Sequence, residues 1–274
     1  MNGKEKAGNM RCKICSYDNP VLFSARVLSK YSIDYYYCSN CGFIQTEEPF
    51  WLEESYKDAI NLSDTGILSR NISLSKYTSV IINLFFNRNK KFLDYAGGYG
   101  IFTRLMRDKG FDFLWTDIYA KNLLSRGFES AGNEQLELLT AFEVLEHLSD
   151  PLKEIENMLT KSRNILFSTE LVPIPVPAPE NWWYYAFEHG QHISFYSTAT
   201  LQYIAKKYSL YYYTNGKNLH LFTEKKINKI LWSTLILLNI SLLQFILCKG
   251  MKSKTVSDMK MMINQEKVRN ESTL

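Results

Sequence analysis

The sequence has little of what marks nucleic-acid-binding, secreted or repetitive proteins. Its formal net charge is +4 over 274 residues, too small to predict a basic surface for nucleic acid. The first eleven residues are polar and charged, without the apolar run of a cleaved signal, so we expect a cytoplasmic protein. No internal repeat or low-complexity tract is present, and the 46% hydrophobic content suffices for one full domain and a smaller appendage.

Cysteine is also scarce, but its spacing is informative. Four of the five cysteines form two Cys-x2-Cys pairs: Cys12, Cys15, Cys38 and Cys41. Each pair places two thiolates on one side of a tight turn, and two pairs complete a tetrahedron around zinc. Redox dithiols are the alternative, and the short context without a βαβ pattern argues against them. Because all four ligands would be cysteine, we predict a structural zinc site with no open coordination position.

The residues around these pairs predict a zinc-ribbon module over residues 1–50. Apolar side chains alternate in residues 21–27 and again in 33–37, which predicts two short strands. Gly42 directly follows the second pair, where the chain needs a permissive backbone. We expect the module to serve folding or substrate docking rather than chemistry.

A glycine-rich loop is the main sign of a ligand site. Residues 91–100 run from an apolar strand start through an acid into this loop, and glycine lets backbone approach a ligand closely. A helix is expected over 101–110, with its free N–H groups pointing back into the loop. A second strand over 111–116 leads to Asp117, whose carboxylate can accept ribose hydroxyls. We therefore predict an adenosine-type cofactor at the carboxyl edge of a parallel sheet.

The residues of the loop discriminate between three cofactor classes. Ile101 and Phe102 stand where a triphosphate-binding loop needs Lys and then Ser or Thr, which argues against that class. Thr103 stands where a dinucleotide loop needs a small residue, a poor fit that leaves a nicotinamide oxidoreductase open. The remaining pattern, Asp-x-(Gly/Ala)-x-Gly-x-Gly, resembles the loop of class I S-adenosylmethionine methyltransferases. Its matching residues are Asp94, Ala96, Gly98 and Gly100.

The rest of the chain predicts an α/β fold. Strands are expected over 136–141 and 165–168, with a short one near Phe128. An Asn-Gly pair at 215–216 separates two apolar runs, the strongest short-range hairpin signal, and a hairpin that ends a parallel sheet needs one reversed strand. Class I methyltransferases have such a strand. We predict a Rossmann-like seven-stranded methyltransferase sheet with an antiparallel last strand, over residues 51–224.

Four segments together resemble a family of bacterial class I methyltransferases, often found in polysaccharide and modified-sugar pathways. They are residues 92–100, 104–108, 140–147 and 188–195. The cysteine module is similar to the zinc-binding front end of sugar C-methyltransferases that act on nucleotide-linked deoxysugars. The resemblance implies an S-adenosylmethionine-dependent enzyme that methylates a small carbohydrate-like substrate, a nucleotide- or lipid-linked sugar.

The same resemblance implies where the cofactor binds. The residues that would hold the methionine end of S-adenosylmethionine are Asp94, Ala96, Gly97, Gly98 and Gly100. Asp117 would hold the ribose, and Phe142 and Glu143 would line the floor beneath the reacting methyl group. Ala96 departs from the first glycine of the pattern, but it adds only a methyl group beside the methionine moiety.

Candidate catalytic residues follow the predicted fifth strand, where class I enzymes build a substrate lid. Residues 171–195 combine alternating prolines, an aromatic run that suits sugar rings or nucleobases, and two histidines that titrate near neutrality. We predict His189 as the general base with Glu188 as its orienting partner, and His192 as the second candidate. His147 is expected at the same edge of the sheet. A packed aromatic loop with hydrogen-bonded histidines is the alternative.

The Glu-x-x-Glu-His run that ends in His147 has two interpretations. It forms only the corner between a strand and a helix, with His147 capping or packing. Alternatively, Glu143, Glu146 and His147 bind Mg²⁺, in a spacing similar to that of magnesium-dependent O-methyltransferases of quinone biosynthesis and small-RNA end methylation. His189 or His192 would then complete the site.

Residues 225–274 are predicted to form a helical extension. Residues 230–248 carry no charge and have lysines on both sides, and their length permits one membrane crossing. Polar residues dilute the run, and lysines at both ends give no orientation signal. Packing on the core or on a second subunit, attachment to a membrane surface and crossing all stay open. The oligomeric state is not predicted.

Two further functions stay open. A zinc-ribbon RNA methyltransferase would need a basic face, and the cysteine module has few basic residues. A non-catalytic module that retained the cofactor fold would bind S-adenosylmethionine without transferring its methyl group.

Overall fold

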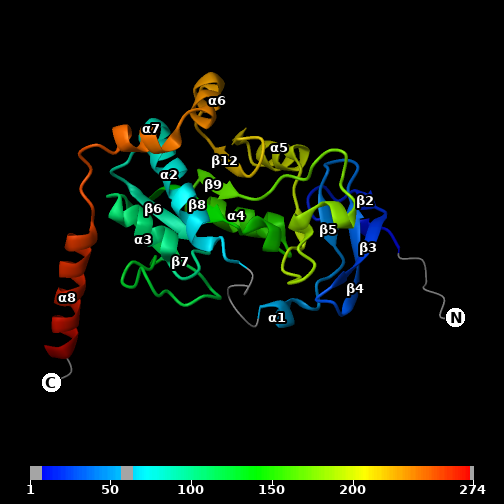
Figure 1. The fold of residues 1–274 in the computed structure, drawn as a ribbon, viewed down its shortest axis with the longest axis horizontal. Helices are drawn as coiled ribbons and strands as arrows, with labels where there is room; N and C mark the ends of the chain where they lie inside the picture. The colour runs from blue at the N-terminus through cyan, green and yellow to red at the C-terminus, as the bar shows by residue number, and fades with distance from the viewer. Residues whose placement is uncertain (1–7, 57–63, 272–274) are drawn as a thin grey trace. The chain divides into compact units, whose positions relative to one another are not determined.

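The computed structural model (Figure 1) describes residues 8–56 and 64–271. The chain divides into two compact units. The cysteine unit comprises Met1–Asn61 and Ala141–Lys226, and the glycine-loop unit comprises Leu62–Thr140 and Ile227–Leu274. Each unit therefore contains one segment from the first half of the chain and one from the second half. The domain bounds 1–50, 51–224 and 225–274 follow chain order and stay predictions.

The cysteine unit begins with small antiparallel sheets. A two-stranded sheet pairs β1 (Met10–Arg11) with β2 (Asp18–Asn19). A four-stranded sheet has the order β10-β5-β4-β3, from β3 (Val21–Val27), β4 (Tyr31–Tyr37), β5 (Ile44–Thr46) and β10 (Ser194–Phe195). The two strands predicted between the cysteine pairs are therefore confirmed. A strand from a distant part of the chain, β10, completes their sheet.

The remaining elements of this unit are mostly helical. They are α1 (Leu52–Ser55), η1 (Leu145–His147), α4 (Pro151–Lys161), β9 (Ile165–Ser168), η2 (Pro179–Asn181), η3 (Trp183–Tyr185), α5 (Thr198–Lys207), β11 (Tyr211–Thr214) and β12 (Leu219–Thr223). Asp150 caps α4 by accepting the N–H of Lys153, with Pro151 in the first turn. Ser197 and Thr200 form a capping box at the start of α5.

An aromatic core joins β3, β4 and β10 to the segment that was expected to form a substrate lid. Tyr35, Trp182, Tyr185 and Phe195 are all buried in this one cluster. The rings of Trp182 and Tyr185 meet edge to face at 4.8 Å. Trp183, by contrast, is 75% exposed. Most of the aromatic run therefore packs as core, and Trp183 is the ring of that run that faces solvent.

The glycine-loop unit contains parallel strands and most of the longer helices. Its elements are α2 (Ile67–Phe85), β6 (Lys91–Tyr95), α3 (Ile101–Asp108), β7 (Asp112–Thr116), α6 (Lys229–Leu237), α7 (Ile240–Leu247) and α8 (Thr255–Glu271), together with most of β8 (Leu136–Phe142). Strand β6 pairs in parallel with both β7 and β8. The predicted strand–loop–helix–strand order around the glycine loop is confirmed.

The central mixed sheet has the strand order β11-β12-β9-β8-β6-β7. Strand β12 runs antiparallel to both β9 and β11, so the predicted reversed last strand is confirmed. The predicted count of seven is not met, because the described residues place six strands in this sheet. Near Phe128 only an isolated bridge joins Trp115 and Glu129. The Trp115 N–H donates to the Phe128 carbonyl and the Ser130 N–H donates to the Trp115 carbonyl, both at 2.8 Å, so this stretch lies beside β7 at the predicted place but pairs over one residue only.

Candidate functional site

The glycine loop between β6 and α3 has a tight, left-handed backbone. Ala96, Gly98 and Gly100 have φ values of 54°, 54° and 82°. A Cβ on Gly100 would lie 2.8 Å from Asn122 Oδ1, so packing excludes a side chain there. A Cβ on Gly98 would meet no described atom within 4 Å. Gly98 therefore presents bare backbone to open space, which is what close approach of a ligand requires.

Asp94 lies behind the loop rather than in that open space. It is 2% exposed, and its carboxylate accepts the hydroxyls of Thr103 at 2.9 Å and Thr140 at 3.2 Å. Burial raises the pKa of Asp94 from 3.8 to about 7. The side chain thereby ties β6 to α3 and β8. Its cofactor role stays a prediction, and these contacts favour an indirect form of it, in which Asp94 positions the loop.

Asp117, unlike Asp94, accepts its hydrogen bonds from backbone N–H groups. One carboxylate oxygen accepts the N–H of Gly98 at 2.9 Å, and the other accepts the N–H groups of Tyr119 and Ala120 at 2.7 Å. The carboxylate fixes the conformation of the loop from the tip of β7. A ribose hydroxyl at Asp117 would share these acceptor atoms, and the ribose role stays a prediction.

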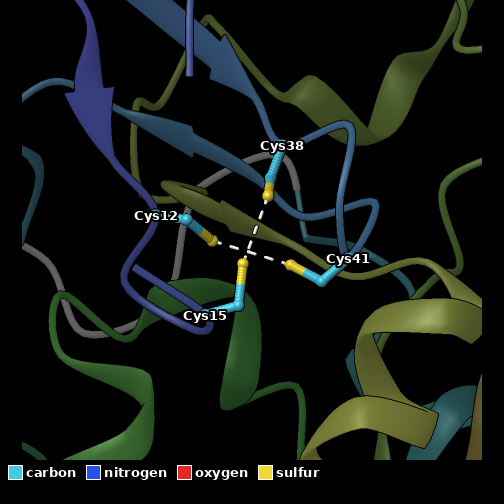
Figure 2. A group of neighbouring side chains, drawn as sticks. All are labelled: Cys12, Cys15, Cys38 and Cys41. Carbon is cyan, nitrogen blue, oxygen red and sulfur yellow. Dashed lines mark hydrogen bonds between the residues drawn. The ribbon is translucent and has the colours of Figure 1, made fainter. Parts of the chain in front are cut away.

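The four cysteines of the two pairs converge on one point (Figure 2). The Sγ atoms of Cys12 and Cys41 are 3.6 Å apart, and those of Cys15 and Cys38 are 3.4 Å apart. A disulfide requires about 2.05 Å, so these distances exclude one. Thiolates around zinc at about 2.3 Å would be about 3.8 Å apart, so the cluster is compatible with a tetrahedral zinc site.

The surroundings of the cluster suit a closed, structural site. The hydrogen bond between Cys12 and Cys41 lowers the pKa of Cys12 and raises that of Cys41, because the Cys41 thiol donates to the Cys12 thiolate. The carbonyl of Cys41 accepts the hydroxyls of Ser197 and Thr200, at 3.3 and 2.8 Å, which connects the second knuckle to the start of α5. Gly42 has φ +73°, and a Cβ there would overlap Ser197 Oγ. The positive φ and the close packing against Ser197 together explain why a glycine is needed after the second pair.

Three histidines lie side by side in the cysteine unit. The ring of His192 is 4.9 Å from that of His147 and 5.0 Å from that of His189. His192 Nδ1 lies 2.8 Å from the Tyr184 carbonyl, which accepts its proton. His147 Nδ1 lies 3.1 Å from the Gln191 carbonyl. In both rings this tautomer leaves the Nε2 lone pair as the acceptor or ligand atom.

His189 has the opposite hydrogen-bond arrangement. Its Nδ1 accepts the N–H of Gln191 at 3.2 Å, so its neutral form carries the proton on Nε2. Glu188 is exposed. The predicted roles of both residues stay predictions.

Glu146 is buried beside these histidines. It is 0% exposed, and among the described residues neither carboxylate oxygen has a hydrogen-bond partner. Burial and the charge of Glu143 raise the pKa of Glu146 to about 8. The hydroxyls of Tyr184 and Thr169 lie near enough to lower this pKa in part, but neither forms a hydrogen bond with the carboxylate. One ligand atom each from Glu146, His147 and His192 lie within 4.8 Å of one another. Burial also lowers the pKa of His147 to about 4, so its ring is neutral at pH 7.

Glu143 takes a different direction from Glu146. Its carboxylate accepts the Ser168 hydroxyl at 2.6 Å, while that hydroxyl oxygen accepts the Glu143 N–H at 2.8 Å. The metal-compatible group therefore contains His192 in place of Glu143. Phe142 ends β8, and its role beneath a reacting methyl group stays a prediction.

The sequence matches the model of a family described as a methyltransferase domain over residues 71–215. The chain belongs to this methyltransferase family. No curated protein matches the sequence.

Solved structures of other methyltransferases are similar to this one at low identity. An O-methyltransferase family 2 protein from Planctomyces limnophilus is 14% identical, with a TM-score of 0.36, over 64% of this chain and 65% of its own length. Magnesium protoporphyrin IX methyltransferase from Synechocystis is 13% identical, with a TM-score of 0.40, over 63% of this chain and 92% of its own length. An O-methyltransferase family protein from Burkholderia thailandensis is 14% identical, with a TM-score of 0.40, over 65% and 68%.

Several residues that shape this methyltransferase have no signal in the sequence. Thr103 and Thr140 hold Asp94, although Thr103 looked only like a poor fit to a dinucleotide loop. Tyr56 places its hydroxyl 3.0 Å from His147 Nδ1, across 91 residues of sequence. Hydroxyl partners of this kind are set by tertiary packing, because Thr and Tyr are common in any element.

Proposed function

We propose that the protein transfers a methyl group from S-adenosylmethionine to a small carbohydrate-like acceptor, a nucleotide- or lipid-linked sugar. Membership in the methyltransferase family supports the reaction. The observation that carries the choice of donor is the bare backbone at Gly98, left-handed and open, between a buried acid and the tip of β7. A sulfonium donor supplies an electrophilic methyl group, so the protein has to bind it, align the acceptor and remove a proton.

The glycine loop fits the methionine end of such a donor. Gly97, Gly98 and Gly100 offer backbone without side chains, and Ala96 shares the left-handed conformation without crowding Gly98. Asp94 keeps the loop in place from behind through Thr103. Asp117 stabilises the Gly98 peptide and remains the candidate for the ribose hydroxyls. Phe142 and Glu143 stay predictions for the floor of the site.

The acceptor class is the finer part of this proposal. It is supported by the resemblance over residues 70–224 to methyltransferases of sugar pathways and by the cysteine cluster at the N-terminal side of the chain. Trp183 adds an exposed aromatic face in the segment 171–195, of the kind that stacks on sugar rings. A zinc-ribbon RNA methyltransferase has less support, because the net charge is only +4.

His192 is the proposed general base when the acceptor is a hydroxyl or a carbon acid. The Tyr184 carbonyl accepts the Nδ1 proton and orients the ring, so a proton removed from the acceptor would be taken at Nε2. His189 is the second candidate, since its Nδ1 lone pair is already used by the Gln191 N–H.

The experiment compares Gly98 with Gly132, two positive-φ glycines in different loops, each with no described atom within 4 Å of an added Cβ. Gly98→Leu should abolish calorimetric binding of S-adenosylhomocysteine, because the side chain enters the space that the donor needs. Gly132→Leu is the matched control, since Gly132 has φ +88° and no described atom within 4 Å of an added Cβ. Binding of NAD instead of S-adenosylhomocysteine by the native protein, or unchanged binding in Gly98→Leu, would contradict the proposal. Transfer assays with nucleotide sugars test the acceptor separately.

A divalent cation is the alternative to a His192 base, because the ion would take the same His192 lone pair. It is favoured by Glu146, which has no hydrogen-bond partner among the described residues, beside the imidazoles of His147 and His192. Two nitrogen donors and one carboxylate suit Mn, Fe or Zn better than Mg²⁺, which prefers oxygen ligands. Such an ion would polarise an acceptor hydroxyl. Titration with Mn²⁺ followed by electron paramagnetic resonance tests it, because thiolate sites prefer softer ions. Glu146→Gln should weaken Mn²⁺ binding at least about tenfold, and equal binding by native and variant protein would exclude the site.

A further inference from the structure

Helices α6 and α7 expose an unusual amount of apolar surface. Their large exposed apolar side chains include Ile230, Leu237, Leu238, Leu242, Phe245 and Ile246. Leu237 is 86% exposed and Phe245 71% exposed. These residues fall within a stretch, 230–248, that contains no charge. A patch of this kind on one pair of helices marks an interaction surface rather than scattered surface residues.

The pair is fixed in place and is not a loose tail. Trp232 and Leu235 of α6 are buried, and Trp232 lies 6.2 Å from the ring of Phe85 on α2. Helix α7 lies against α2 (Figure 1), where Lys76 donates a hydrogen bond to Ser241 at 3.1 Å. One face of the pair therefore packs within the glycine-loop unit, and the apolar residues named in the previous paragraph lie at exposed positions.

The geometry of the pair suits insertion at a surface. Among the described residues no single helix is long and apolar enough to cross a membrane, while α6 and α7 together pass by length and composition but are bent by 113°. The bend lies between Leu238, the C-cap of α6, and Asn239, which caps α7 by accepting the N–H groups of Ser241 and Leu242. The helices are about 14 and 12 Å long, well short of the about 30 Å of a bilayer core.

Basic residues flank the apolar patch at both ends. Between residues 224 and 254 the sequence has one acid, Glu224, and six lysines: Lys225, Lys226, Lys229, Lys249, Lys252 and Lys254. Lysines at both ends of an apolar segment complement an anionic surface that both ends can reach. A second copy of this chain is a poorer occupant, because pairing the two patches would bring like-charged lysines together.

We propose that the apolar face of α6 and α7 inserts into the surface of a membrane that contains anionic lipids. The bent pair lies in the headgroup region, with its lysines at the phosphates and its leucines and phenylalanine among the upper acyl chains. The proposal is independent of the methyl acceptor. It concerns where the methyltransferase works rather than what it methylates.

The test is flotation of the full-length protein with vesicles of phosphatidylcholine alone or with one third phosphatidylglycerol. We expect binding to the anionic vesicles at least about tenfold stronger than to the neutral ones, and weaker in high salt. The variant Leu242→Glu with Phe245→Glu should lose at least about tenfold in vesicle affinity. The matched control is Val256→Glu with Met259→Glu on α8, at positions 58% and 53% exposed against 57% and 71% for the test pair.

Two further measurements make the outcome decisive. The variant Lys229→Gln with Lys249→Gln and Lys252→Gln should lose the preference for anionic vesicles while it remains folded, as judged by circular dichroism. Light scattering measures the oligomeric state of every variant. Absence of vesicle binding by the native protein, or equal binding by the test and control variants, would overturn the proposal. A dimer that Leu242→Glu with Phe245→Glu dissolves, without vesicle binding, would also overturn it and assign the patch to a second copy.

Discussion

The hydroxyl of Thr103, in the first turn of α3, donates a 2.9 Å hydrogen bond to the buried carboxylate of Asp94 at the end of β6. This contact connects the two elements that flank the glycine loop. It makes the shape of the loop depend on a buried polar pair rather than on the glycines alone.

Removal of the Thr103 hydroxyl should therefore both destabilise the protein and loosen the loop. We expect Thr103→Val to lower the free energy of unfolding by about 1–3 kcal/mol, because a buried acceptor loses a partner. S-adenosylhomocysteine should bind more weakly. Urea unfolding and calorimetry measure the two effects. The control Thr160→Val removes an exposed hydroxyl bonded to the Asn157 carbonyl and should change neither.

Asp94 should make stability depend on pH. Its pKa rises from 3.8 to about 7 on folding because the folded protein buries it, so the protonated form is favoured in the folded state. The stabilisation of the folded state by this protonation is complete below pH 3.8 and is lost as the pH rises through about 7. The free energy of unfolding of Asp94→Asn, relative to that of the native protein, should therefore be higher at pH 8 than at pH 5. An unchanged difference in urea unfolding at the two pH values would refute this.

The four-cysteine cluster should hold one zinc ion per chain and stabilise the cysteine unit. Cys15→Ser should abolish the bound zinc, as measured by mass spectrometry, and lower the melting temperature by about 10 °C. Cys248→Ser is the control, since Cys248 lies on the chain after α7 and outside the cluster. Retention of stoichiometric zinc by Cys15→Ser would show that the site is not the one described.

A buried ion pair should hold α8 to α3. Arg107 Nε and Nη2 each lie 2.8 Å from an Asp258 carboxylate oxygen, and both residues are buried. Asp258→Ala leaves a buried guanidinium with fewer partners and should cost about 3 kcal/mol. Hydrogen exchange in residues 255–267 should accelerate. The control Asp64→Ala breaks the partly exposed pair with Arg70 and should cost less than about 1 kcal/mol.

The two candidate bases should differ in turnover. If His192 accepts the proton, His192→Gln should reduce kcat about 100-fold or more at saturating donor. His189→Gln should reduce it only a few-fold, because its Nδ1 lone pair is occupied. Measured donor affinity should stay the same in both variants. The reverse order of the two losses would return the base to His189.

Local signals in the sequence predicted much of the fold. The Asn-Gly pair at 215–216 predicted the hairpin of β11 and β12, and the run around residues 91–117 predicted β6, α3 and β7. The cysteine spacing predicted a four-sulfur cluster. Each of these depends on neighbours within a few residues or on a ligand geometry that constrains spacing. The short strand expected near Phe128 is reduced to a single parallel bridge between Trp115 and Glu129, so the described residues place six strands in the central sheet.

The tertiary structure alone decided which distant residues meet. Strand β10 joins the sheet of the cysteine module, so most of the aromatic run in the expected lid became core. The hydrogen-bond partners of His147, His189 and His192 came from the same packing, and they set which ring nitrogen carries the proton. Sequence by itself determined the turns, caps and metal-type spacing, since their energies are local. Packing decided protonation and partners, because burial and hydrogen bonding across tens of residues depend on the assembled core.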